Sequence, residues 1–275
     1  MIETRHSAGV DRRLATAAFG DRPGQWPLPT AATPQQLWLR AVACGGQGRY
    51  GSAYRDLATL RRTGDRRLVS LAHSTQGSFL RQQGWHTLAR GWDGRALALA
   101  GGDDEARADA LIGLAADALG IGRFAAAAAL LRRADAVLAG GAVPARLPVR
   151  RGWVCAELAM ASGDGEAAVR HAAEAVELAR AMRLTGEHAP ARHLLKSDVV
   201  LAAALCSAGR IERARAVAEP ALDEAGRLGL VPLRWALACL LIDIGCVTFS
   251  AQKVQDVRDI CAGQVRHAGG TWRSA

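Results

Sequence analysis

A short motif that recurs along the chain constrains the fold more than any other feature. Each copy begins with a glycine, which is usually followed by a polar residue, and ends with an alanine five positions after the glycine. Successive glycines lie 36, 38, 41 and 46 residues apart. A period in this range is typical of proteins that stack one supersecondary unit repeatedly. The five copies are Gly48 to Ala53, Gly84 to Ala89, Gly122 to Ala127, Gly163 to Ala168 and Gly209 to Ala214.

The motif fits the turn of a helical hairpin. A helical pattern precedes and follows each glycine, and alternating strand patterns are essentially absent. The first helix must end abruptly, and glycine adopts the left-handed conformation without the steric cost of a Cβ atom. The small alanine allows the second helix to pass close to the first. One helix pair cannot bury its apolar face alone, so we expect the pairs to stack.

These residues resemble the tetratricopeptide repeat family. The resemblance covers roughly residues 35–245 and implies a right-handed α-solenoid of about five to six repeats, of the kind found in bacterial regulators. Two features depart from the family pattern: each repeat lacks the usual final proline, and the spacing exceeds the family's 34 residues. The third unit matches best, with apolar residues around its turn at Leu111, Leu114, Ala115, Ala127, Leu131 and Ala134.

The two ends of the chain differ from its middle. Residues 20–34 are rich in glycine and proline and predict an extended arm, preceded by a short helix over 11–19. Thr33 and Gln36 predict the capping box of the first repeat helix. Residues 232–245 and 253–265 predict a degenerate sixth pair that caps the array, and 267–275 predict a frayed tail. The expected domains are an arm at 1–33, a repeat domain at 34–265 and a tail at 266–275.

The chain is strongly basic, with a formal charge of +9, and its only lysines are Lys196 and Lys253. Such a charge could attract nucleic acid or an acidic protein. The arginines are scattered in pairs along the whole chain, however, which favours the codon bias of a GC-rich genome as their origin. The six cysteines form no C-x-x-C pair, and free thiols buried in a reducing cytosol account for them. Without a secretory signal or an 18-residue apolar run, the expected location is cytoplasmic.

Candidate catalytic and metal-binding groups are weak. Glu187, His188 and His193 lie close in sequence, but on a polar connection between helices. His171 and Glu174 share a helix face, but no second motif completes a metal site. Gly-rich phosphate loops and the G-x-S-x-G motif are absent. We therefore expect no catalytic site, no metal and no cofactor.

The best candidate for a functional surface is the concave groove. In the family the first helix of each repeat lines this inner wall, and the positions that face it can be carried over from the turn. Three of them are tryptophans, which could anchor a bound peptide or helix, or could instead pack between helices. The positions are Trp38, Ser74, Ser78, Arg81, Ile112, Trp153, Glu157, Lys196, Val199 and Trp235, and the proposed binding residues are Trp38, Arg81, Trp153, Glu157, Lys196 and Trp235.

The expected function is that of a non-enzymatic protein–protein interaction module, an adaptor or regulatory scaffold. It would bind an extended or helical segment of an acidic partner in the groove. The arm that carries Trp26 and Pro27 could itself occupy part of that groove. Two alternatives remain open: a nucleic-acid-binding protein that uses its basic surface, and a small-molecule sensor with a closed pocket between the repeats.

Overall fold

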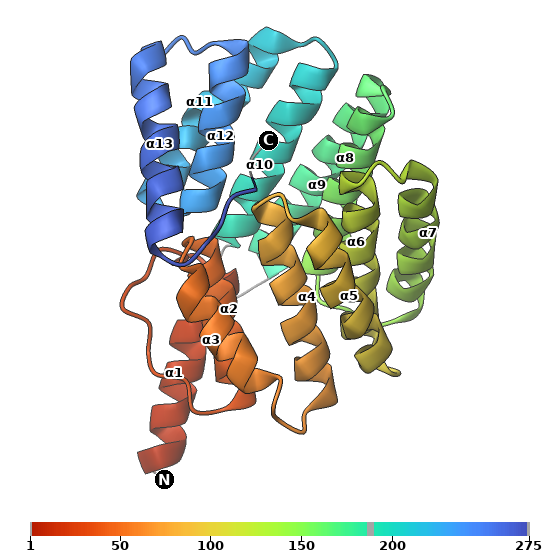
Figure 1. Cartoon of the computed structure of the whole chain (residues 1–275), viewed down its shortest axis with the longest axis vertical. Helices are drawn as coiled ribbons and strands as arrows, with labels where there is room; N and C mark the ends of the chain where they lie inside the picture. Colours follow the sequence, from red (N-terminus) through yellow and green to blue (C-terminus); the bar gives the residue numbers. More distant parts are fainter. Residues whose placement is uncertain (1, 186–189, 274–275) are drawn as a thin grey trace.

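The computed structural model describes the backbone of residues 2–185 and 190–273, and the side chains of residues 8–184 and 190–273. In this part of the chain every regular element is an α-helix (Figure 1). The helices are α1 (Ile2–Phe19), α2 (Pro34–Gly46), α3 (Tyr50–Leu60), α4 (Arg66–Gln82), α5 (His86–Ala100), α6 (Asp104–Gly120), α7 (Phe124–Gly140), α8 (Arg146–Ala161), α9 (Gly165–Thr185), α10 (Ala191–Ser207), α11 (Ile211–Arg227), α12 (Val231–Ile244) and α13 (Ala251–His267).

Helices α2 to α13 form six successive pairs. The two helices of each pair pack against each other, and the first helix of each pair also contacts the first helix of the next. The predicted all-helical fold with consecutive packing is therefore confirmed. None of the helices in the described ranges has an apolar stretch long enough to cross a bilayer.

The recurring motif performs the structural role expected of it. The five turn glycines have φ angles of +77°, +87°, +76°, +77° and +71°, all in the left-handed region. The five alanines that follow are completely buried, which is what a close approach of the paired helices requires. Gly229, with φ of +63°, makes the same kind of turn between α11 and α12.

The N-terminal segment packs against the repeats. Helix α1 is longer than the predicted helix over 11–19 and contacts both α2 and α10. The arm is held by Gln47, whose Nε2 donates to the carbonyl oxygens of Pro23 and Gln25 at 2.8 and 3.0 Å. The capping box is confirmed, because Gln36 N donates to Thr33 Oγ1 and the Gln36 side chain accepts in return.

The C-terminal segment is also packed. Helices α12 and α13 form the predicted sixth pair, but the prediction of a frayed tail is wrong for residues 268–273. The backbone N–H of Arg273 donates to Gln83 O at 2.9 Å, and that of Thr271 donates to the Gln83 side chain. The Trp272 ring stacks on Trp235 with 4.1 Å between centroids.

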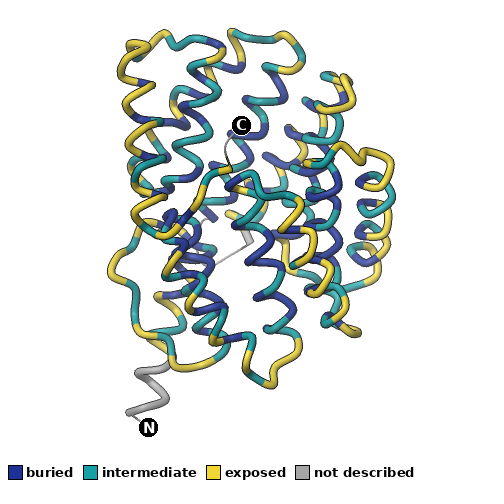
Figure 2. Tube along the Cα trace, in the orientation of Figure 1, coloured by how far each residue is buried: buried dark blue, intermediate teal, exposed yellow. Residues whose placement is uncertain are grey.

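The first and last helix pairs are in contact. Gly51 N, in α3, donates to Ala268 O, just after α13, at 2.7 Å. Val265 of α13 belongs to the same buried core as the residues of α1 to α4, and Val231 of α12 packs against it. Buried residues recur in the helices throughout the part of the trace that the structure describes (Figure 2).

Candidate functional site: a cavity lined by the first helix of every pair

A cavity of about 450 Å³ lies among α2, α4, α6, α8, α10 and α12, and Phe19 at the end of α1 forms part of its wall. This volume falls in the range of small-molecule sites, roughly 300–1,000 Å³. Nine of the ten positions that the sequence placed on the groove line this cavity; Val199 instead lies in the apolar core around α10 to α13. The cavity wall includes all six proposed binding residues: Trp38, Arg81, Trp153, Glu157, Lys196 and Trp235.

The tryptophans are fixed by their surroundings. The indole N–H of Trp38 donates to Thr75 Oγ1 at 3.1 Å, and that of Trp153 donates to Ser197 Oγ at 2.9 Å. Trp235 stacks on Trp272 of the tail. Each ring packs against neighbouring elements, as the second interpretation of these residues predicted, and each also lines the cavity; an anchoring role stays a prediction.

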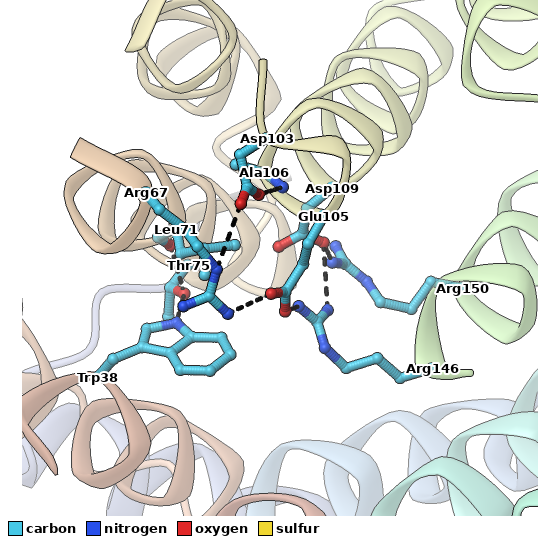
Figure 3. A network of polar contacts seen from close by, with 10 residues as sticks. All are labelled: Trp38, Arg67, Leu71, Thr75, Asp103, Glu105, Ala106, Asp109, Arg146 and Arg150. Atoms are coloured by element: carbon cyan, nitrogen blue, oxygen red, sulfur yellow. Dashed lines mark hydrogen bonds and ion pairs between the residues drawn. The ribbon is translucent and has the colours of Figure 1, made fainter. Parts of the chain in front are cut away.

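Five cationic and two acidic side chains line the wall: Arg81, Arg146, Arg150, Arg192 and Lys196, with Asp109 and Glu157. Some of these side chains belong to a network of ion pairs that joins α4, α6 and α8 (Figure 3). Arg146 pairs with Glu105 at 2.7 Å and with Asp109 at 3.4 Å. Glu105 also pairs with Arg67, and Asp109 also pairs with Arg150. Three guanidinium groups therefore share these two carboxylates, and Arg67 reaches a third, on Asp103, at 3.6 Å.

Arg192 differs from the other cations of the wall. Within the described ranges it has no carboxylate at ion-pair distance; its Nη1 donates to Val42 O at 3.3 Å, and its guanidinium lies 5.7 Å from the Phe19 ring centroid. Burial, together with the positive charge of Arg146, lowers the pKa of Arg192 to about 10. Burial also lowers the pKa of Arg150 to about 10, with Arg81 and Arg192 contributing. Positive charge in this part of the wall is thus incompletely balanced.

Some polar atoms of the wall have no hydrogen-bond partner in the described part of the protein. They include Ser74 Oγ and His193 Nδ1, on side chains of residues that are each 2% exposed. His193 lies between Trp153, at a centroid distance of 5.6 Å, and Phe19, at 6.1 Å. Burial and then Arg192 hold the pKa of His193 well below its usual value, so its ring is neutral. Buried polar atoms without partners are rare in native proteins.

Arg81 belongs to a buried charge triad. Its guanidinium pairs with Asp93 of α5 and lies 2.9 Å from Asp117 Oδ1 of α6. Burial, opposed by Arg81 but reinforced by Asp117, raises the pKa of Asp93 to about 7. Because both carboxylates are fully buried, Arg81 is held rigidly where it faces the cavity.

The other candidate groups do not form a reactive site. Glu187 and His188 lie outside the described residues, whereas His171 and Glu174 approach within 4.0 Å on the surface of α9. The described residues include no group of three or more His, Cys, Asp or Glu side chains arranged to hold a metal. All six cysteines are free, and burial raises the pKa of the Cys44 and Cys155 thiols to about 11.

Sequence reasoning did not place five residues on the cavity wall, although His193 was considered as a metal ligand: Phe19, Arg146, Arg150, Arg192 and His193. A signal for three of them was present in the helical period. Arg146 and Arg150 precede Trp153 by seven and three positions, and Arg192 precedes Lys196 by four, so each shares a helix face with a predicted wall residue. No comparable local signal identifies Phe19, because α1 lies outside the repeats.

No protein-family model matches the chain, and no curated protein is detectably similar to it. The cavity is therefore the feature from which a function has to be inferred.

Proposed function

We propose that this protein is a non-enzymatic regulatory binding protein, a right-handed α-solenoid of tetratricopeptide-like repeats that holds a small molecule in its central cavity. The observation that carries the proposal is the contact between the first and last helix pairs. This contact converts the concave side of the array into a cavity of about 450 Å³. Of the functions that the sequence suggested, a cavity of this volume favours the small-molecule sensor.

The segments beside the cavity favour a small ligand over an extended partner segment. Phe19 at the end of α1 forms part of the wall, and Trp272 of the tail covers one face of Trp235. Residues 20–33 do not line the cavity: Trp26 is exposed, and its ring centroid lies 3.7 Å from the guanidinium carbon of Arg49. An extended segment would have to displace α1 or the tail, whereas a small molecule would not.

Binding would act on the whole array. The first helices of all six pairs line the cavity, so a ligand bound there could contact each of them. Any molecule that binds only the folded, closed form stabilises that form in proportion to its concentration. Such a ligand would hold the two ends of the array together, and a partner that recognises the outer surface would sense its presence.

The wall favours binding over catalysis. Ser74 Oγ makes no hydrogen bond to a base among the described residues, and the depressed pKa of His193 makes that ring a poor proton acceptor. Activated nucleophiles require an adjacent base or a lowered pKa. The cavity thus contains groups that orient a ligand but no pair suited to attack it.

The test is native mass spectrometry of the protein purified from its own cells. Ala116 lines the cavity, and the larger side chain of Ala116→Phe would take up part of its volume; Ala126, exposed on α7, provides the matched control Ala126→Phe. We expect a co-purifying small molecule on the unmodified protein and on Ala126→Phe, and its loss from folded Ala116→Phe. A small molecule retained equally by all three, or absent from all three, would contradict the proposal.

A partner segment that inserts only its end is the second candidate. Glu157 and Lys196 pair at 3.5 Å with side chains 34% and 31% exposed, so an acidic residue arriving from solvent could take the place of Glu157. Affinity capture with and without nuclease tests this function. A discrete protein that survives nuclease and is lost with Trp153→Ala would support it. Capture that collapses after nuclease treatment would instead support nucleic-acid binding.

A further inference from the structure

We propose that the cavity binds a small organic monoacid, with its carboxylate on Arg192 and a flat apolar body against the aromatic side chains of the wall. This inference rests on the small-molecule function proposed above and specifies the chemical class of the ligand.

The charge of the ligand follows from the ion pairs of the wall. Arg81, Arg146, Arg150 and Lys196 each have a carboxylate partner. Arg192 has none in the described part of the chain and makes only one long hydrogen bond, to Val42 O. Its guanidinium therefore keeps N–H donors for a bound anion, in the planar arrangement that matches a carboxylate. A single unpaired cation favours a single negative charge over a phosphate, which carries about −1.5 to −2 near neutral pH.

The shape of the ligand follows from the rings beside Arg192. Trp38, Phe19, His193 and Trp153 form a continuous series with centroid separations of 5.3, 6.1 and 5.6 Å. The Arg192 guanidinium lies against Phe19 in this series. A carboxylate on Arg192 thus places the group that bears it directly on aromatic surface. Flat apolar groups gain most from such surroundings, through offset or edge-to-face contacts.

The volume of the cavity also suits such a molecule. At about 450 Å³ it lies within the range of small-molecule sites. The site therefore combines one charge contact and an aromatic surface, in a volume that suits an aromatic acid.

Isothermal titration calorimetry with a matched pair of probes tests the charge. The probes are 1-naphthoate and its uncharged analogue 1-naphthamide, which have nearly the same shape. We expect the unmodified protein to bind the naphthoate at least ~10-fold more tightly, because a hydrogen bond to a charged group contributes more than a neutral one. Arg192→Gln should abolish this preference, and Arg192→Lys should retain part of it. Arg132→Gln, at an exposed position on α7, should leave it unchanged.

Each alternative result contradicts the proposal in a different way. Equal binding of both probes would exclude charge recognition. A preference that survives Arg192→Gln would exclude Arg192 as the partner of the carboxylate. Either result would leave the small-molecule function intact. Tighter binding of 1-naphthyl phosphate than of naphthoate would exclude the monoacid. If no probe binds, the monoacid is excluded, and native mass spectrometry with Ala116→Phe then decides separately whether the cavity holds any small molecule. Thermal melting of each variant establishes that it is folded.

Discussion

At the residue scale, the buried triad determines which side chains its neighbours can carry. Asp93 of α5 lies between Gly77 of α4 and Gly113 of α6. A Cβ atom at either glycine would lie only 2.5 or 2.6 Å from an oxygen of the Asp93 carboxylate. The carboxylate cannot move aside, because Arg81 and the neighbouring Asp117 hold it. Both glycines are therefore explained by a close approach between helices.

The first prediction concerns Gly77. Alanine stabilises a helix by about 1 kcal/mol relative to glycine when nothing else changes. We nevertheless expect Gly77→Ala to lower the free energy of unfolding by about 1–3 kcal/mol, because the added methyl overpacks the triad. Gly91→Ala is the control, since a Cβ there meets no atom within 4 Å; it should leave stability unchanged or raise it. Urea unfolding followed by circular dichroism measures both, and a stabilised Gly77→Ala would refute the overpacking.

The second prediction concerns the pH dependence of the same triad. Asp93 is in contact with Arg81 and Asp117, and it also interacts with the charge of Arg150. Its pKa of about 7 in the folded protein exceeds the ordinary value near 3.9. The folded state therefore binds the proton more tightly than the unfolded state does. The penalty from this buried charge is fully present above about pH 7 and disappears as the pH falls toward 4.

We therefore expect the free energy of unfolding of Asp93→Asn, relative to that of the unmodified protein, to be higher at about pH 8 than at about pH 5.5, where Asp93 is largely protonated. The measured quantity is the difference in free energy of unfolding between the two proteins at each pH. A difference that does not vary with pH would show that Asp93 keeps an ordinary pKa.

At the element scale, the turns were predictable and the terminal segments were not. The glycine and alanine of each motif act within one hairpin, so their spacing in sequence is enough to place the turn. Phe19 and Trp272 acquire their positions from partners far away in sequence, His193 and Trp235. No local pattern records such contacts, which explains why the tail was expected to fray.

The six predicted wall residues reach one cavity because they share a register relative to the turns. The unpaired state of Arg192, in contrast, depends on all of its neighbours.

The third prediction separates backbone strain from packing at one turn. Gly122 has φ of +76°, and a Cβ atom there meets nothing within 4 Å. Gly122→Ala should therefore lower the free energy of unfolding by roughly 1–2 kcal/mol through strain alone. Gly122→Asn should cost less, because asparagine tolerates the left-handed region better than alanine does. Urea unfolding of the two variants decides the matter, and equal losses would contradict the role given to strain.

At the scale of the whole molecule, closure distinguishes this array from a linear stack. In a linear array each repeat contacts only its neighbours, and the ends open independently. Here Ala268 and Gly269, which follow α13, lie against Gly51 of α3. The first pair is therefore stabilised by the last, and the cavity between them depends on that contact.

Gly269 provides the test of closure. A Cβ atom there would lie 2.9 Å from the backbone of Gly51, and its φ of +86° also disfavours any other residue. Gly269→Ala should therefore separate the two ends, and hydrogen exchange should become faster not only after α13 but also at Gly51 and the start of α3. Gly263→Ala, on α13 with nothing within 4 Å of the added methyl, should leave exchange at α3 as it is. If Gly269→Ala loosens only its own segment, then the two ends touch without supporting each other. In that case the last helix pair would not be coupled to the first, and the cavity would not depend on the contact between them.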